Sequence, residues 1–146
     1  MAVKQDFTED EWKTMQRGLT GAGMLVSFAD GDVRDGLAEA KALTRFLSEE
    51  HKHGRSPLVR DLADIPGSGF SPTTSEQELE TETLASLRQA VATLEAKAPE
   101  EVAGYRELVI DLSANVAAAR LGVQRSESAM IDKIHEALGG PPATYK

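Results

Sequence analysis

Apolar residues recur along most of this chain at steps of three and four, which is the spacing of one face of an α-helix. The first run of this kind consists of Trp12, Met15, Leu19, Ala22 and Val26. Just before it, Thr8 and Glu11 form a capping-box sequence, whose hydroxyl and carboxylate can satisfy the free amide groups of a helix start. Phe7 precedes this box and Trp12 follows it, at the spacing of a hydrophobic staple. The pattern predicts a helix that begins after Thr8.

Three glycines, Gly18, Gly21 and Gly23, interrupt this first helix. Each one costs about 1 kcal/mol relative to alanine in a helix interior. Such a cost indicates either that another backbone packs closely against the helix at these positions or that the helix bends there.

A second apolar run follows a break at 30–32. Its members are Leu37, Ala40, Leu43 and Leu47. Positively charged side chains and then Gly54 come after it, as is usual at a helix C-terminus. Ser56 and Pro57 then predict a short helix over 57–62, because proline is favoured at the first helical position.

The second half of the chain has the same helix start and stop signals. Ser75 and Glu78 form another capping box, which opens a helix that ends at Ala98. Pro99 starts the next helix, because proline needs no hydrogen bond of its own there, and that helix runs to a break at 121–123.

We expect Ser126 to cap the last helix, which the glycines and prolines of 139–142 stop. Strand signals do not recur in the sequence. It therefore predicts an all-α fold, a single domain over residues 1–146 built as an antiparallel bundle of six to seven helices. The one long irregular segment, 65–74, is of the kind that is often functional or mobile. We expect the tail from about residue 141 to be loose.

Residues 27–47 and 117–138 share a layout: a helix rich in small residues ends, a short break follows and an amphipathic helix begins. This likeness predicts two pseudo-repeated helix–turn–helix elements. Any all-α protein can produce the same pattern without duplication, so both interpretations stay open.

Composition limits the partners. The chain has 16 Lys and Arg against 24 Asp and Glu, a net charge of −8, and its pI is about 4.9. This balance argues against non-specific binding to nucleic acid or anionic lipid and favours cations, basic surfaces or neutral molecules. The absence of cysteine excludes disulfides, thiolate zinc sites and a cysteine nucleophile.

We expect a cytoplasmic protein that does not insert into membranes. The N-terminal residues have no apolar segment after Lys4, and no uncharged stretch reaches the roughly 20 residues that a membrane-spanning helix needs.

The most suggestive chemical group is acidic. Asp30 and Asp32 lie in the predicted turn, while Asp35 and Glu39 are four residues apart on one face of the following helix. Hard cations bind several carboxylate or carbonyl oxygens, which this stretch can supply. We therefore identify these four acids as candidate ligands of Ca²⁺ or Mg²⁺.

The stretch does not match an EF-hand loop. Arg34 stands at the third acidic position, Asp35 stands where glycine is needed, and Lys41 stands where the closing glutamate is required. In the alternative interpretation, Asp30 belongs to the turn and Asp32 caps the next helix, where an acid is favourable to the helix dipole.

Other polar groups have simpler interpretations. His51 and His53 could bind a transition metal, but a solvated cationic helix end is the commoner role of such a pair. Glutamates alternate over 76–82 and indicate a solvated face. Asn115 has the spacing of the apolar residues of its helix, so we expect it to face the core and to find a hydrogen-bond partner there.

Two stretches, 26–33 and 116–139, resemble the TerB-like tellurite-resistance family. They share with it an alanine-rich helix, Asp30-Gly31 with Val33, and Glu127 opening an amphipathic helix that ends in Leu138-Gly139. The resemblance implies an all-helical fold of about seven helices, a stress-response context and divalent-cation binding by acids of both helix–turn–helix elements. It thereby adds Glu127 to the candidate ligands.

The chain departs from the family pattern once in each element. Leu37 stands where the family has glutamate, and Arg120 and Leu121 replace the second Asp-Gly. A site of this kind would need Asp30 and Glu127 to meet across the two elements, or Asp32, Asp35 and Glu39 to compensate.

The sequence is compatible with three functions. The first is divalent-cation binding at the acidic turn by a non-enzymatic domain. The second is protein interaction or self-association through the glycine-marked first helix and the 65–74 segment. The third is a small carboxylate-based enzyme. We expect no enzyme, because the sequence offers neither a hydrolytic triad nor a phosphate-binding loop.

Overall fold

The structure is a computed structural model that describes residues 4–28, 36–54, 56–65, 75–118 and 125–139. Within these ranges the chain forms six α-helices and two short 3-10 turns and contains no strand, so the predicted all-α class is confirmed. In chain order the elements are η1 (Lys4–Asp6), α1 (Glu9–Phe28), α2 (Gly36–His53), α3 (Pro57–Leu62), α4 (Glu76–Lys97), η3 (Pro99–Glu101), α5 (Val102–Ala118) and α6 (Arg125–Ala137).

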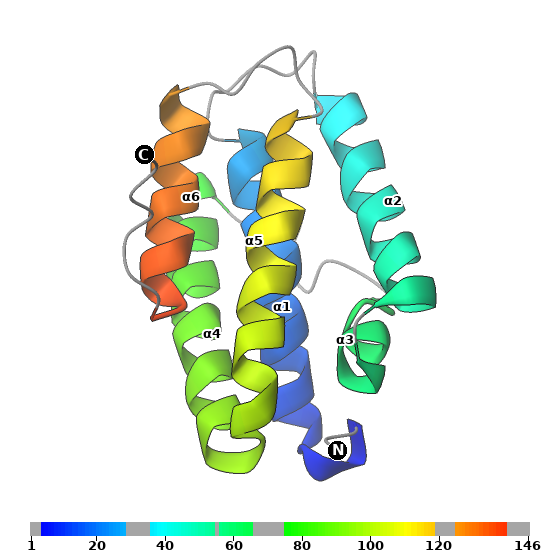
Figure 1. Ribbon diagram of the computed structural model, residues 1–146. Helices are drawn as coiled ribbons and strands as arrows, with labels where there is room; N and C mark the ends of the chain where they lie inside the picture. Colours follow the sequence, from blue (N-terminus) through cyan, green and yellow to red (C-terminus); the bar gives the residue numbers. More distant parts are fainter. Residues whose placement is uncertain (1–3, 29–35, 55, 66–74, 119–124, 140–146) are drawn as a thin grey trace.

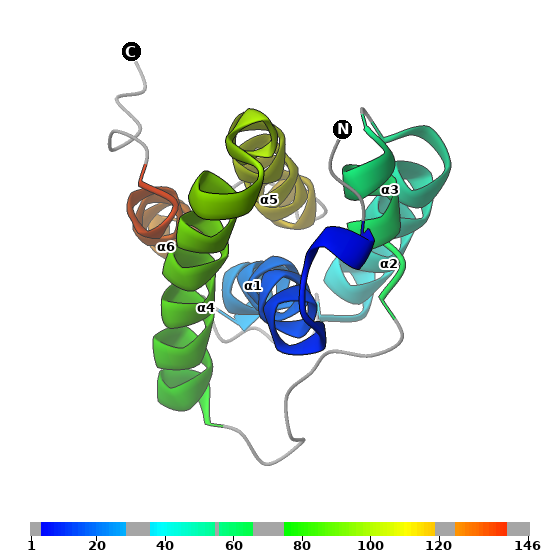
Figure 2. The same ribbon diagram turned by 90° about the horizontal axis from the view of Figure 1, so that it is seen from below.

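Helix α1 is the central element of the bundle, because it contacts all five other α-helices (Figures 1 and 2). Its most extensive partner is α4, which runs antiparallel to it. Glu11 near the start of α1 pairs with Lys97 at the end of α4, and Gly21 in the second half of α1 faces Thr83 in the first half of α4. Helices α5 and α6 cover another side of this pair, and α2 with α3 packs beside α1 and α5.

The helix starts form as the sequence predicts. Thr8 N donates to Glu11 Oε1 at 2.8 Å, and Glu11 N donates to Thr8 Oγ1 at 3.1 Å, so the capping box is closed in both directions. The Oγ atom of Ser56 accepts from Val59 N at 3.2 Å at the start of α3. The corresponding hydroxyl of Ser75 caps α4. The last helix differs from expectation, because α6 begins at Arg125 and therefore already includes Ser126.

Hydrogen bonds to free carbonyls and a left-handed glycine end α2 and α6. Gly54 N donates to Glu50 O at 2.8 Å after α2. Gly139 follows α6 with a φ of +79°, a left-handed conformation that glycine adopts without steric cost. Arg106 Nε donates to Leu138 O at 2.8 Å and so satisfies a carbonyl that the helix leaves free.

The core is built from the apolar faces that the sequence indicates. The five members of the first apolar run, Trp12, Met15, Leu19, Ala22 and Val26, are all buried. Tyr105 on α5 is fully buried beside them, and its hydroxyl donates to Met15 O at 2.7 Å. Burial raises the pKa of the Tyr105 hydroxyl above its ordinary value, because the charged phenolate would lose its hydration.

The glycines of α1 accommodate neighbouring side chains. A Cβ atom on Gly18 would lie 2.8 Å from Tyr105 Oη, and one on Gly23 would lie 2.9 Å from Leu43 Cδ1. A Cβ atom on Gly21 would overlap the side chain of Thr83. Side chains of α2, α4 and α5 therefore occupy the space beside these glycines, where the sequence predicted either a closely packed backbone or a bend of the helix.

One expectation about a polar residue needs correction. Asn115 is exposed, because it lies at the edge of the buried arc of α5 and in the last turn of that helix. Ser113 is the buried polar residue there, and its Oγ atom donates to Val109 O at 2.8 Å. On the acidic face of α4, Glu82 pairs with Arg17 at 3.3 Å and Glu80 pairs with Lys133 at 3.0 Å. These exposed pairs join α4 to α1 and to α6.

In the described part of the chain, none of the helices has the length and apolar character needed to cross a membrane.

Candidate functional site

The predicted acidic site lies mostly outside the described residues. Asp30, Asp32 and Asp35 fall in the stretch between α1 and α2 that the structure does not describe. Glu39 belongs to the first turn of α2, and Glu127 belongs to the first turn of α6. The ligand set therefore stays a prediction.

The backbone does show where the two predicted elements turn. Helix α1 ends, α2 begins, α5 ends and α6 begins at one end of the bundle, which is the upper end in Figure 1. The turns of Glu39 and Glu127 thus share this end, on helices that both pack against α5. Among the described side chains, no three His, Asp or Glu residues come together in a group that could hold a metal ion.

His51 and His53 end α2 with exposed side chains. The Nδ1 atom of His51 lies 2.9 Å from Arg60 O, a carbonyl that can only accept, so the ring donates through Nδ1. This contact joins the end of α2 to α3 and is consistent with a structural role for His51.

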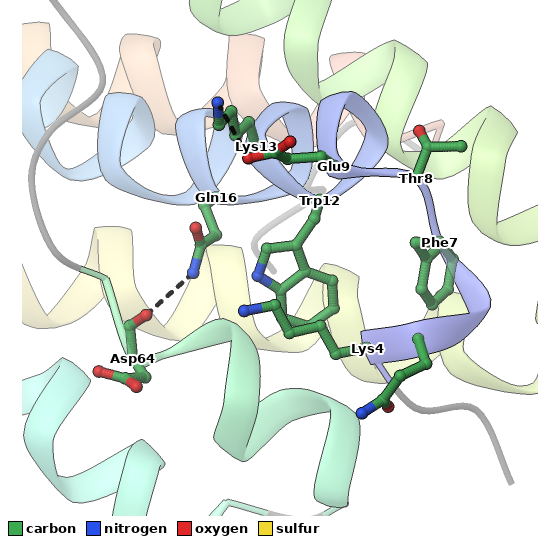
Figure 3. Close-up of a pocket in the computed structure, with 9 residues that line it drawn as sticks. Lys4, Phe7, Thr8, Glu9, Trp12, Lys13, Gln16 and Asp64 are labelled. Atoms are coloured by element: carbon green, nitrogen blue, oxygen red, sulfur yellow. Dashed lines mark hydrogen bonds and ion pairs between the residues drawn. The ribbon is translucent and has the colours of Figure 1, made fainter.

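A groove lies at the opposite end of the bundle, between η1, the first half of α1 and the residues after α3 (Figure 3). Its volume is about 760 Å³. The described residues that line it are Lys4, Gln5, Phe7, Thr8, Glu9, Trp12, Lys13, Gln16 and Asp64. We call it the Trp12 groove, and its volume is within the roughly 300–1,000 Å³ that is usual for ligand sites.

The aromatic rings of Phe7 and Trp12 form the floor of the Trp12 groove. Phe7 and Trp12 are the hydrophobic staple of α1, with ring centroids 6.1 Å apart and an interplanar angle of 45°. The residues are only 8% and 5% exposed, so their positions are fixed by the core. The Nζ atom of Lys4 lies 5.5 Å from the centroid of the Trp12 ring, at cation–π distance.

Gln16 fixes the far wall of the groove. Its Nε2 atom donates to Asp64 O at 3.0 Å (Figure 3) and to Leu62 O at 3.3 Å. These bonds hold the segment after α3 against α1 and satisfy carbonyls at the end of a short helix. The groove therefore has a wall joined to the core by side-chain hydrogen bonds.

An ion pair fixes the start of α1 near the groove. Lys97 Nζ at the end of α4 donates to Glu11 Oε1 and lies 6.0 Å from the centroid of the Phe7 ring. The hydrogen bond from Lys97, followed by the one from Thr8 N, lowers the pKa of the Glu11 carboxyl below its ordinary value. The Glu11 carboxylate of the capping box therefore stays ionised to a lower pH than an ordinary glutamate does.

Sequence reasoning identified the staple but did not identify the groove. Phe7 and Trp12 were visible as a pair because they lie close in the sequence. Lys4 and Asp64 belong to segments far apart in the chain, and only the packing of α3 against α1 brings them to one surface. A lone tryptophan beside lysines was the only sequence signal for this site.

The glycine-marked face of α1 is not free for a second copy of the chain. Gly18, Gly21 and Gly23 are buried, and side chains of α2, α4 and α5 lie against them. Of the segment 65–74, the structure describes only Ile65. The glycine-marked part of the surface that was expected to support self-association is therefore buried within the fold, while 66–74 lie outside the described residues, so self-association stays a prediction.

Comparisons with protein-family models, with curated proteins and with solved structures each found no match to this chain.

Proposed function

We propose that this chain is a protein-interaction module that binds a segment of a partner protein in the Trp12 groove. The observation that carries the proposal is the groove itself, a hollow with two buried aromatic rings below it and exposed polar side chains on its walls. The core holds both rings in place, so a partner that packs over them orders no flexible side chain at this part of the groove, which keeps the entropic cost of binding small.

The chemistry of the described lining favours binding over catalysis. It contains no histidine. Its one hydroxyl, on Thr8, already accepts a hydrogen bond from Glu11 N. Side chains of this kind can contact and orient a ligand, whereas nucleophilic catalysis needs a nucleophile beside a base. We therefore propose a non-enzymatic role.

Peptide selection tests this proposal. Peptides selected from a random-sequence display library on the wild-type protein are measured for affinity against two double variants. Gln5→Ala with Lys13→Ala shortens two exposed side chains of the groove wall. Arg88→Ala with Gln89→Ala makes the matching change on an exposed part of α4 that does not line the groove.

The proposal predicts that the groove variant binds the selected peptides several-fold more weakly and that the α4 variant binds them like the wild type. Equal affinities in all three proteins, or a selection that yields no binding peptide, would contradict it.

A second proposal is that the domain is TerB-like and binds a divalent cation at the end of the bundle that holds Glu39 and Glu127. The observation that favours it is that α2 and α6 both begin at this end, so the two predicted acidic elements share one side of the fold. A stress-response context and a cytoplasmic location belong to this proposal, which rests on the sequence resemblance.

Thermal unfolding tests the cation site. A ligand at 100 times its dissociation constant stabilises the folded state by about 2.7 kcal/mol. We expect excess Ca²⁺ or Mg²⁺ to raise the melting temperature relative to chelator, and Asp30→Asn with Asp32→Asn to abolish the increase. No shift with either ion, or the same shift in the variant, would overturn this second proposal.

A further inference from the structure

Lys4 places a positive charge over the floor of the Trp12 groove. Its ammonium group lies 5.5 Å from the Trp12 ring centroid (Figure 3). Among the residues that the structure describes, this ammonium group forms no ion pair and no hydrogen bond. The face of the indole ring is therefore already a site where the molecule accepts a cation.

The lysine can leave this position without breaking other polar contacts. Lys4 is exposed and belongs to the three-residue turn η1. The backbone bond that closes this turn, from Phe7 N to Lys4 O at 3.1 Å, does not involve the side chain. Rotation of the Lys4 side chain into water loses only the cation–π contact, so a cation of a ligand can replace it.

One carboxylate of the groove lining, that of Asp64, can serve a bound cation. Its exposed side chain points away from the Trp12 ring in Figure 3 and can rotate towards the groove. The Asp64 carboxylate has no hydrogen-bond or ion-pair partner in the described part of the chain, where only its backbone groups are bonded. Glu9, the other acid of the lining, pairs with Lys13 at 3.6 Å, and this pair extends away from the Trp12 ring in Figure 3. The net charge of −8 also attracts basic partners at long range.

We propose that the Trp12 groove binds a lysine or arginine side chain of the partner segment, which replaces Lys4 on the Trp12 ring and has Asp64 as its counter-charge. This inference rests on the proposed function of the groove and deepens it by naming the charge of the occupant.

The test uses Trp12 fluorescence, because Trp12 is the only tryptophan of the chain and reports directly on this site. Three synthetic peptides of equal length are titrated against the protein. One carries lysines between small neutral residues, the second carries acetyl-lysines at the same positions, and the third carries glutamates. We expect only the lysine peptide to change the emission, with an affinity that falls as salt is added.

Two variants distinguish this inference from a general electrostatic attraction. Lys4→Ala removes the internal competitor for the Trp12 ring. The affinity for the lysine peptide should therefore rise by about two- to fivefold, the equivalent of an exposed cation–π contact. Asp64→Asn removes a counter-charge and should weaken binding by about the same factor. The controls Lys52→Ala and Asp132→Asn change exposed charges outside the groove lining and should have only minor effects.

Three results would overturn the inference: equal binding of the acetyl-lysine peptide, preference for the glutamate peptide, or a Lys4→Ala variant that does not bind the lysine peptide more tightly. If peptides from the display selection still bind in a way that depends on Gln5 and Lys13, the proposed docking function stands and only the charge assignment fails. If no selected peptide binds, the docking function fails as well.

Discussion

Gly21 of α1 and Thr83 of α4 are so close that a Cβ atom on Gly21 would overlap both the Oγ1 and the Cγ2 atoms of Thr83. Thr83 is completely buried, so its side chain has no solvent to move into. The absence of a side chain at Gly21 therefore sets the distance between the two helices that contact each other most extensively.

Gly21→Ala should destabilise the protein by about 1–3 kcal/mol, although alanine is the better helix former, because overpacking in a closed core exceeds the gain in helix propensity. Urea unfolding followed by circular dichroism measures the change. In a Thr83→Ala background the same substitution should cost clearly less, since the overlapping atoms are gone. An equal cost in both backgrounds would show that the glycine is needed for another reason.

Thr20→Val should leave stability unchanged or raise it by up to about 1 kcal/mol. The Oγ1 atom of Thr20 is buried and has no hydrogen-bond partner among the described residues. Its removal therefore relieves an unsatisfied polar group without the loss of a bond. The midpoint of chemical unfolding is the measurement, and a loss above 1 kcal/mol would mean that the hydroxyl has a partner.

Tyr105→Phe should cost about 1–2 kcal/mol at neutral pH, because Met15 O loses its buried donor. The raised pKa of Tyr105 has a further effect. Its stabilising contribution is complete below the unfolded value of about 10 and is lost as the pH rises above it. Wild-type stability should therefore fall in alkali more steeply than that of the variant. Parallel curves for the two proteins would contradict this assignment.

Glu11→Gln should keep the capping box, since glutamine can also serve at this position, but it removes the charge that pairs with Lys97. The pKa of Glu11 is lowered in the folded state. Its contribution is present above the unfolded value of about 4.3 and disappears as the pH falls through the lower folded value. Thermal melts across acidic pH should show a shallower loss for the variant, whereas Thr8→Ala should cost about 1 kcal/mol.

Gly139→Ala should destabilise the end of α6 by about 1 kcal/mol, because the positive φ penalises a Cβ atom. A Cβ atom there would also lie 3.2 Å from Arg106 Nη2. Gly139→Asn is the matched control, since asparagine tolerates this conformation better and should cost less. Identical unfolding midpoints for the two variants would argue against the backbone explanation.

Local signals in the sequence predicted most of the helix boundaries. The structure confirms three predicted helix starts. Thr8 and Glu11 cap α1, Ser75 caps α4, and α3 begins at Ser56-Pro57. They were readable because each involves residues within one turn of the same helix. The burial of Asn115 was predicted wrongly, because burial depends on other helices. The periodicity of α5 does not show where a neighbouring helix stops covering its face.

Contacts between distant segments could not be predicted in this way. The approach of Thr83 to Gly21 and the meeting of Lys4 with Asp64 at one groove depend on how α4 and α3 pack on α1. The acidic turn drew attention because its residues are adjacent in the sequence, yet Asp30, Asp32 and Asp35 lie outside the described residues. The predicted metal site is therefore still a matter for experiment.

The most direct measurement of the proposed docking site is a map of amide and indole chemical shifts during titration with a peptide selected on this protein. The account predicts that the Trp12 indole N–H signal moves together with the backbone amides of Lys4, Thr8, Lys13 and Asp64, and that the amides of α4 and α6 away from the groove stay in place. Movement centred on those two helices, with an unchanged Trp12 signal, would contradict it.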